Sequence, residues 1–181
     1  MKIPGEPEPT FGRFLNMKDL KTKYKDRTVR LRILTPADEF CTGFIKFGAD
    51  KKPVRIRDGE SFPDVEWGPG LDGKEQLSRR FWACAVYNHA VGAEQVFEFT
   101  QASIYYALGA LLDDDDWGDL TGYDIKLRSA GELKDTEYSV LPVGKAPMPP
   151  SVAESWKALK SSWLGLEALF DGKDPFDTLP F

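Results

Sequence analysis

Positive charge is concentrated near the beginning of this chain, where it could hold a polyanion. Between Arg13 and Arg57 the sequence has 13 lysines and arginines against five aspartates and glutamates. The sign reverses from Gln101 to Phe181, where seven basic residues face fourteen acids, and the whole chain carries a net charge of -5. Such an asymmetry predicts a polyanionic partner for the basic part, although a lopsided solvated surface would give the same counts.

The acidic part offers one candidate for catalysis. Four consecutive aspartates occupy positions 113–116, with Asp119 and Asp124 close in sequence, and such a set could bind divalent metal in a nuclease. A nuclease site, however, needs carboxylates that converge from separate elements. This run instead follows a helical pattern, where negative charge opposes the helix dipole and serves to end the helix. With one histidine and no nucleophile beside a base, the sequence predicts a protein that is not an enzyme.

The cysteines and the histidine do not indicate a metal centre. Cys41 and Cys84 lie within apolar strand-like runs, where a buried thiol is the expected state, and His89 is the only histidine. Together they fall short of the four ligands of a zinc site. We therefore predict no metal and no cofactor.

Length and composition suit one domain with a tail. The chain has 181 residues, of which 41% are hydrophobic, enough for a core. The first residues, M-K-I-P-G-E-P-E-P, lack the apolar centre of a secretory signal, and no apolar run is long enough to span a membrane. We expect an intracellular protein with no membrane contact.

Alternating apolar residues predict the strands that must position the charged groups. In residues 27–34, Val29, Leu31 and Ile33 share one face, while Arg30 and Arg32 share the other, which we expect to be exposed. Further strands are predicted at 40–47, 53–57, 80–88, 95–100, 123–129 and 136–140, with a helix at 101–113. About six strands with one helix before the last pair predict a mainly β protein, a small barrel of the OB type with one core helix.

Proline-rich segments suggest the domain boundaries. We predict a leader at 1–15, the β domain at 16–145, a proline linker with an amphipathic helix at 146–170, and an acidic tail at 171–181. The helix is expected over 151–170 with Ser151 as its N-cap, and it would either pack on the barrel or mediate self-association.

The segment 117–138, W-G-D-L-T-G-Y-D-I-K-L-R-S-A-G-E-L-K-D-T-E-Y, followed by S-V-L-P, resembles the single-stranded DNA-binding proteins of tailed bacteriophages. Their last core strands carry a similar Y-D-I, basic, Gly, D-T-x-Y and Pro pattern. Upstream pieces agree in order, namely F-G-R-F-L, R-L-R-I-L, F-W-A-C-A-V-Y-N and F-E-F-T-Q-A-S-I-Y-Y-A-L. The resemblance covers roughly residues 11–145, and its specificity comes from the order and spacing of the pieces.

This resemblance implies an OB-fold that coats single-stranded DNA with little sequence preference during replication, recombination or repair. Some members of the phage group hold zinc between their early and late strands. Residues 58–79 here contain neither Cys nor His, so zinc is not carried over.

Binding single strands requires a basic groove with aromatic platforms, on which each stacked base contributes about 1–3 kcal/mol. The predicted phosphate contacts are Arg30, Arg32, Lys46, Lys51, Lys52, Arg55 and Arg57. The predicted stacking platforms are Phe44, Trp67, Trp82 and Tyr87, any of which could equally belong to a core, Trp82 above all. Phe44 is favoured because Thr42 and Lys46 share its strand face.

The last eight residues, D-P-F-D-T-L-P-F, resemble the acidic tip with which bacterial single-stranded DNA-binding proteins recruit replication and repair enzymes. The predicted partner-binding residues are Asp174, Phe176, Asp177, Leu179, Pro180 and Phe181. We also expect the tail acids to occupy the basic groove when DNA is absent, so that deleting residues 171–181 leaves the fold intact and raises DNA affinity. A frayed terminus without a role is the alternative.

A second interpretation is a protein-interaction or assembly module that binds no nucleic acid and uses the helix carrying Trp156 and Trp163. The surroundings of Arg55 and Arg57 distinguish the two interpretations. In a DNA-binding protein they would lie in a groove with exposed aromatics, whereas in an interaction module they would be paired with surface acids.

Overall fold

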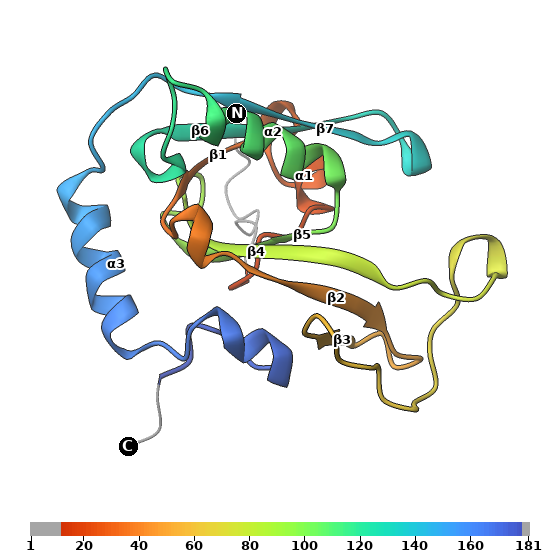
Figure 1. Cartoon of the computed structure of the whole chain (residues 1–181). Helices are drawn as coiled ribbons and strands as arrows, with labels where there is room; N and C mark the ends of the chain where they lie inside the picture. Colours follow the sequence, from red (N-terminus) through yellow and green to blue (C-terminus); the bar gives the residue numbers. More distant parts are fainter. Residues whose placement is uncertain (1–11, 179–181) are drawn as a thin grey trace, which may run out of the picture.

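The structure, a computed structural model, describes residues 12–178 and is built mainly from β-strands (Figure 1). Within this range one antiparallel sheet contains β1 (Thr28–Ile33), β2 (Cys41–Phe47), β3 (Pro53–Ile56), β4 (Arg79–Asn88), β5 (Ala93–Phe99), β6 (Asp124–Ala130) and β7 (Glu137–Pro142). The helices are α1 (Asp19–Thr22), α2 (Ala102–Asp113) and α3 (Pro150–Ser162). Short 3₁₀ turns are η1 (Lys25–Arg27), η2 (Ala37–Glu39), η3 (Leu71–Gly73), η4 (Leu120–Gly122), η5 (Leu133–Asp135) and η6 (Leu166–Asp171). The predicted mainly β class is confirmed.

Strand β4 is the centre of the sheet. Its first half pairs with β2, where Cys41 lies opposite Ala83, and its last residues pair with β1, where Leu31 lies opposite Asn88. Strand β5 occupies the other edge of β4. The full order is β3-β2-β4-β1-β6-β7, and within residues 12–178 no pairing joins the two ends of this order. The sheet is therefore open, and the closed OB barrel expected from the sequence is not shown.

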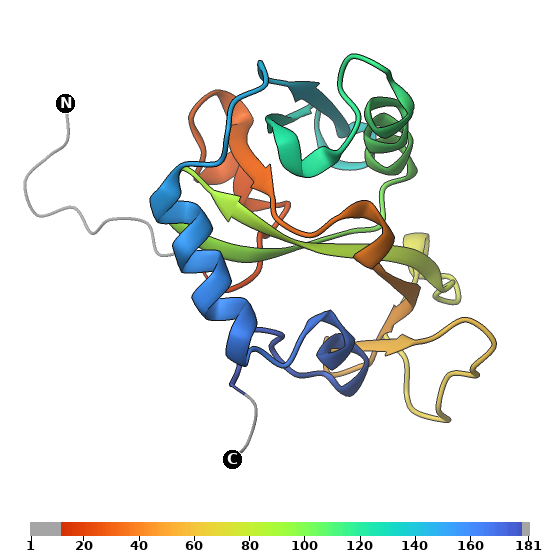
Figure 2. The ribbon, with the colours of Figure 1, turned by 60° about the vertical axis from the view of Figure 1, so that its left-hand side comes forward.

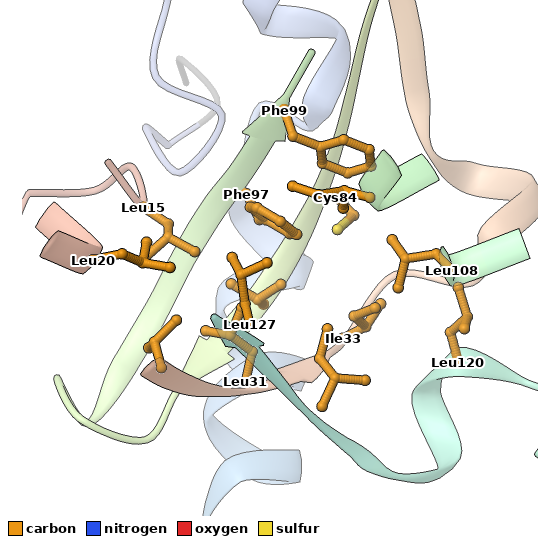
Figure 3. Packing of buried hydrophobic residues seen from close by; sticks show 14 of the residues in the cluster. Leu15, Leu20, Leu31, Ile33, Cys84, Phe97, Phe99, Leu108, Leu120 and Leu127 are labelled. Atoms are coloured by element: carbon orange, nitrogen blue, oxygen red, sulfur yellow. The ribbon is translucent and has the colours of Figure 1, made fainter. Parts of the chain in front are cut away.

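The two faces of the sheet carry separate cores, because successive side chains of a strand point to opposite sides. We call one the α2 face: there Leu31, Cys84 and Phe97 are fully buried and pack with Leu108 of α2 (Figure 3). Burial of such side chains stabilises a fold by about 1.5–3 kcal/mol each, so this cluster is a main source of stability.

The opposite face, the α3 face, carries Phe81, Ala83 and Ala85. These residues pack with Trp156 of α3 and Leu169 of η6 in a second buried cluster. Figure 2 shows η6 and α2 on opposite sides of β4. The C-terminal helix thus packs back on the sheet, one of the two alternatives that its apolar stripe allowed.

The predicted single helix at 151–170 is wrong in length. Helix α3 ends at Ser162, Trp163 is extended, and Gly165 has a φ of 90°, a conformation that glycine adopts without strain. The chain then turns back as η6. The predicted N-cap Ser151 is also wrong, because the helix begins at Pro150 after Pro149.

The C-terminal segment of the described chain belongs to the second core. Phe176 is only 3% exposed and its ring stacks on Trp163 with centroids 5.9 Å apart. Arg13 lies over the same ring at 5.9 Å, and its Nε is 3.9 Å from an oxygen of Asp174. Next to Arg13, the chain lines the free edge of β5, since Leu15 N donates to Val96 O.

No helix within residues 12–178 has the length and apolar character needed to cross a bilayer.

Candidate functional site

Aromatic rings and cations alternate along the α2 face where helix α2 no longer covers it. We call this set the stripe; it consists of Tyr105, Trp82, Arg80, Phe44, Lys46 and Trp67. Strand pairing positions its centre, because Thr42 lies opposite Trp82 and Phe44 lies opposite Arg80. Directly opposed residues of an antiparallel pair share a face, so β2 and β4 present these side chains together.

One end of the stripe is a stack of rings. Tyr105 of α2 lies on Trp82 with centroids 4.5 Å apart and planes inclined by 15°. Trp82 also stacks on the buried Phe99, at 5.6 Å. Tyr105 is 46% exposed, so it is the ring of this stack that a ligand could reach.

The centre of the stripe is a guanidinium over a ring. The Arg80 guanidinium carbon lies 4.4 Å from the centroid of Phe44. The two terminal nitrogens of Arg80 donate to the carboxylate oxygens of Asp58 at 3.2 and 3.3 Å, and one of them also donates to the Thr42 hydroxyl at 3.2 Å. This arrangement holds a half-exposed cation against a platform of β2.

At the other end, Lys46 lies over the ring of Trp67, with its ammonium nitrogen 4.3 Å from the centroid. Trp67 comes from the long loop between β3 and β4. Gln76 anchors this loop to the end of β2, because its amide accepts from Phe47 N at 2.7 Å and donates to Phe47 O at 2.8 Å. Phe62 supports Trp67 edge-on at 5.5 Å. The loop is thus tied to the sheet and supplies a platform.

Two further predicted cations lie beyond β2. Lys51 and Lys52 are exposed in the turn before β3, and the ion pairs found within residues 12–178 do not include either of them. Lys51 has a φ of 66° in this turn, and Asp50 accepts from Lys52 N. They extend the positive charge of the stripe past Lys46.

Beside Tyr105 the stripe opens into a pocket of about 570 Å³ between β2, β4 and α2. Phe40, Trp82, Phe99 and Tyr105 form aromatic walls, and Asp113 lies at its rim. Pockets of this size commonly hold small organic molecules.

Arg30 and Arg32 are not free cations of the stripe. Arg32 is 3% exposed; its Nε donates to Asp124 at 2.6 Å and its Nη2 to the Ala146 carbonyl at 3.0 Å. Arg30 Nε donates to the other Asp124 oxygen at 2.7 Å, and His89 Nε2 lies 3.1 Å from that oxygen. The prediction that both arginines are exposed is wrong for Arg32, because a carboxylate 92 residues away covers it.

Arg30 and Arg32 keep the carboxyl group of Asp124 ionised. Burial alone would raise the pKa of its carboxyl, but hydrogen bonds from Arg32 and Arg30 outweigh burial and hold the pKa below its usual value. This carboxylate therefore neutralises two arginines. Within the part of the chain that the structure describes, no group of acids, histidines and cysteines could hold a metal ion.

Arg55 and Arg57 lie on or near the α3 face and are paired with acids. Arg55 makes two hydrogen bonds to Glu98, at 2.6 and 2.9 Å, and its side chain is 7% exposed. Arg57 donates to Glu167 at 3.2 Å and covers the ring of Phe170 at 4.3 Å. Both arginines are paired with acids, as the interaction-module interpretation predicts, but of Glu98 and Glu167 only Glu167 is a surface acid, since Glu98 is 17% exposed.

Tyr87 is also separated from the other predicted platforms. It lies opposite Arg32 in the register of β1 and β4, packs on the second core, and meets His89 edge-on at 5.2 Å. Of the four predicted platforms, the structure therefore brings together Phe44, Trp67 and Trp82.

Part of the predicted partner-binding tail is buried in the second core. Phe176 is buried rather than free to enter a partner's pocket, and Asp174 is partly buried beside Arg13. Asp177 is exposed, while Leu179, Pro180 and Phe181 lie outside the described residues. Deleting residues 171–181 would remove Phe176 from the second core, so on the structure we expect this deletion to destabilise the fold.

Both cysteines are structural. Burial, followed by the carboxylates of Glu167 and Glu98, raises the pKa of Cys41 to about 12, and burial raises the pKa of Cys84 as well. Such thiols carry no thiolate at neutral pH and are poor nucleophiles.

Sequence reasoning missed Arg80 and Tyr105. Arg80 could have been found, because it stands two residues before Trp82 and so shares its strand face. Tyr105 had no comparable signal, since its ring meets Trp82 only through the packing of α2 on the sheet.

No protein-family model matches the chain, and neither the curated proteins nor the solved structures give a match. The resemblance to phage proteins therefore stays a prediction. The function has to be inferred from the residues of the stripe.

Proposed function

We propose that the protein binds single-stranded DNA along the stripe and coats it with little sequence preference. The observation that carries the proposal is the alternation of aromatic rings and cations on one sheet face, from Tyr105 to Trp67. Single strands present phosphates and unpaired base faces in the same alternation, and all bases have a face that can stack.

The geometry of Arg80 and Lys46 supports this function. In the free protein each cation lies within 4.4 Å of a ring centroid that a base could use. Both side chains are long enough to move from the ring to a phosphate, leaving Phe44 and Trp67 to the bases. Cation–ring contacts at partly exposed sites contribute only about 0.5–1 kcal/mol, so the exchange costs little for Lys46, whereas Arg80 would also have to leave its hydrogen bonds to Asp58 and Thr42.

Salt dependence follows from the number of cations near the stripe. Lys46, Lys51, Lys52 and Arg80 are the candidates for phosphate contacts. Four contacts to a single strand predict that the logarithm of affinity falls with the logarithm of salt concentration with a slope of about -3.

The wider role is part of the same proposal. The order of elements, with helix α2 between β5 and the final hairpin of β6 and β7, is compatible with an OB-type barrel. Together with the phage resemblance, this suggests a non-enzymatic coating protein of replication, recombination or repair, acting inside the infected cell. Partner recruitment would use Asp177 and the residues that follow it, since Phe176 is buried.

A protein-interaction module remains the second candidate, because Arg55 and Arg57 pair with Glu98 and Glu167 as it predicts. Those ion pairs lie on or near the α3 face, however, and do not explain why aromatic rings and cations alternate along the stripe. We therefore favour DNA binding.

Fluorescence anisotropy distinguishes the two candidates. Labelled oligo-dT of about 16 nucleotides and a matched duplex are titrated at two salt concentrations, with tryptophan emission recorded in parallel. We expect salt-sensitive binding to the single strand and quenching that weakens in Trp67→Phe. Absence of binding at low salt would refute the proposal.

Two variants that each remove one positive charge test whether DNA binds along the stripe. Lys46→Gln removes a cation of the stripe, and Lys157→Gln removes an exposed cation of α3. We expect weaker binding from the first and unchanged binding from the second. Equal effects would mean that DNA binds through overall charge and not along the stripe.

A further inference from the structure

The pocket beside Tyr105 continues the stripe but has a different character. Its aromatic walls are Phe40, Trp82 and Tyr105, and no lysine, arginine or histidine lines it. Gly109 and Ala110 on the facing helix leave it open, and a Cβ added to Gly109 would meet no atom within 4 Å. The pocket can therefore take a planar ring but offers no cation for a phosphate.

The negative charge at the rim of the pocket restricts which chemical groups can bind there. Asp113 is the charged residue among those lining the pocket, and it begins the run of exposed aspartates at 113–116. These carboxylates repel a phosphate that approaches this end of the stripe. A carboxylate accepts a hydrogen bond from an exocyclic amino group, as Asp and Glu do with the amino group of cytosine.

We propose that this pocket holds one nucleobase of the bound strand and favours a base that carries an amino group, cytosine in the first instance, over one that does not. The base lies against Tyr105, and Asp113 accepts a hydrogen bond from its amino group. The inference rests on the proposed DNA binding by the stripe and adds a local base preference to it.

The test uses short oligo-dT in which one central nucleotide is replaced by deoxycytidine or by deoxyuridine. The two bases have nearly the same shape. They differ at C4, which carries an amino donor in cytosine and a carbonyl acceptor in uracil, and at N3, which carries a hydrogen only in uracil. One hydrogen bond to a partly exposed carboxylate predicts roughly two- to tenfold tighter binding of the deoxycytidine oligonucleotide, measured by anisotropy competition.

Asp113→Ala and Asp115→Ala form a matched pair. Both remove one charge from the same acidic run, but only Asp113 lines the pocket. We expect the first variant to lose the preference for deoxycytidine and the second to keep it. Loss of charge should raise the affinity for unsubstituted oligo-dT in both variants.

The possible outcomes distinguish the base pocket from DNA binding by the stripe. Equal affinity of wild type for both oligonucleotides, or the same preference in both variants, would overturn the base pocket while leaving DNA binding by the stripe intact. Failure of every oligonucleotide to bind would instead overturn the proposed function itself.

Discussion

Replacing Phe176 by alanine tests whether the C-terminal segment belongs to the core. The ring is 3% exposed and stacks on Trp163, with Arg13 on it as well. Phenylalanine-to-alanine changes in cores cost about 3–5 kcal/mol. Because the segment lies near the end of the described chain and can relax around the cavity, we expect the lower limit, about 3 kcal/mol.

Urea unfolding followed by tryptophan emission measures this loss, and thermal unfolding should show a melting temperature lower by about 6–12 °C. Asp177→Ala is the control, because the Asp177 side chain is exposed and the residue is held by backbone hydrogen bonds: its carbonyl accepts from Leu164 N, and its N–H donates to the Asp174 carbonyl. The control should change stability by less than about 0.5 kcal/mol. If Phe176→Ala were equally harmless, Phe176 would be a free anchor and the second core would end at η6.

Three other predictions concern the helix, the buried cluster and the thiols. Gly109→Ala should raise stability by about 1 kcal/mol in thermal unfolding, because the new methyl group enters open space on α2; a loss would show that the helix face is covered. Asp124→Asn should cost about 3–5 kcal/mol at neutral pH, since it leaves Arg32 buried without a counter-charge. Because the pKa of Asp124 is lowered by folding, its stabilisation is complete above about pH 4 and is lost as the pH falls through the lowered pKa, so urea midpoints of variant and wild type should converge only in acid. Cys41 and Cys84 should not react with a thiol reagent in the native protein at about pH 8 but should both react in urea; native reactivity would contradict their burial.

The strands were predictable because they are half-buried and antiparallel. In β1 the alternation of Val29, Leu31 and Ile33 marks the buried α2 face, and the strand ends within one residue of the prediction. The same reasoning failed for Arg32. Alternation shows which face a side chain shares, but only the distant Asp124 and Ala146 decide whether that face is covered.

The candidate site was predictable in part. Phe44 and Lys46 followed from the period of β2, whereas nothing in the sequence places the predicted platform Trp67 relative to them. The contact of Trp67 with Lys46 depends on Gln76 anchoring that loop, a long-range interaction that leaves no local pattern. The helical spacing of apolar residues continues past Gly165, but helix α3 ends at Ser162 and the chain turns back as η6 to pack on the sheet. Tertiary packing therefore overrides the periodicity of the sequence.

The contact of Arg13 with Phe176 joins residues from opposite ends of the described chain. Until α3, η6 and Phe176 have left the ribosome, the apolar side chains of Phe81 and Ala85 on the α3 face have no covering layer. The core on the α2 face can assemble earlier, because its buried residues end with β6 and the partly buried Tyr138 and Val140 that pack on it lie in β7. Folding on the ribosome therefore passes through a state with one packed face and one exposed apolar face. Chaperone binding to nascent chains should end only when residue 176 has left the ribosome.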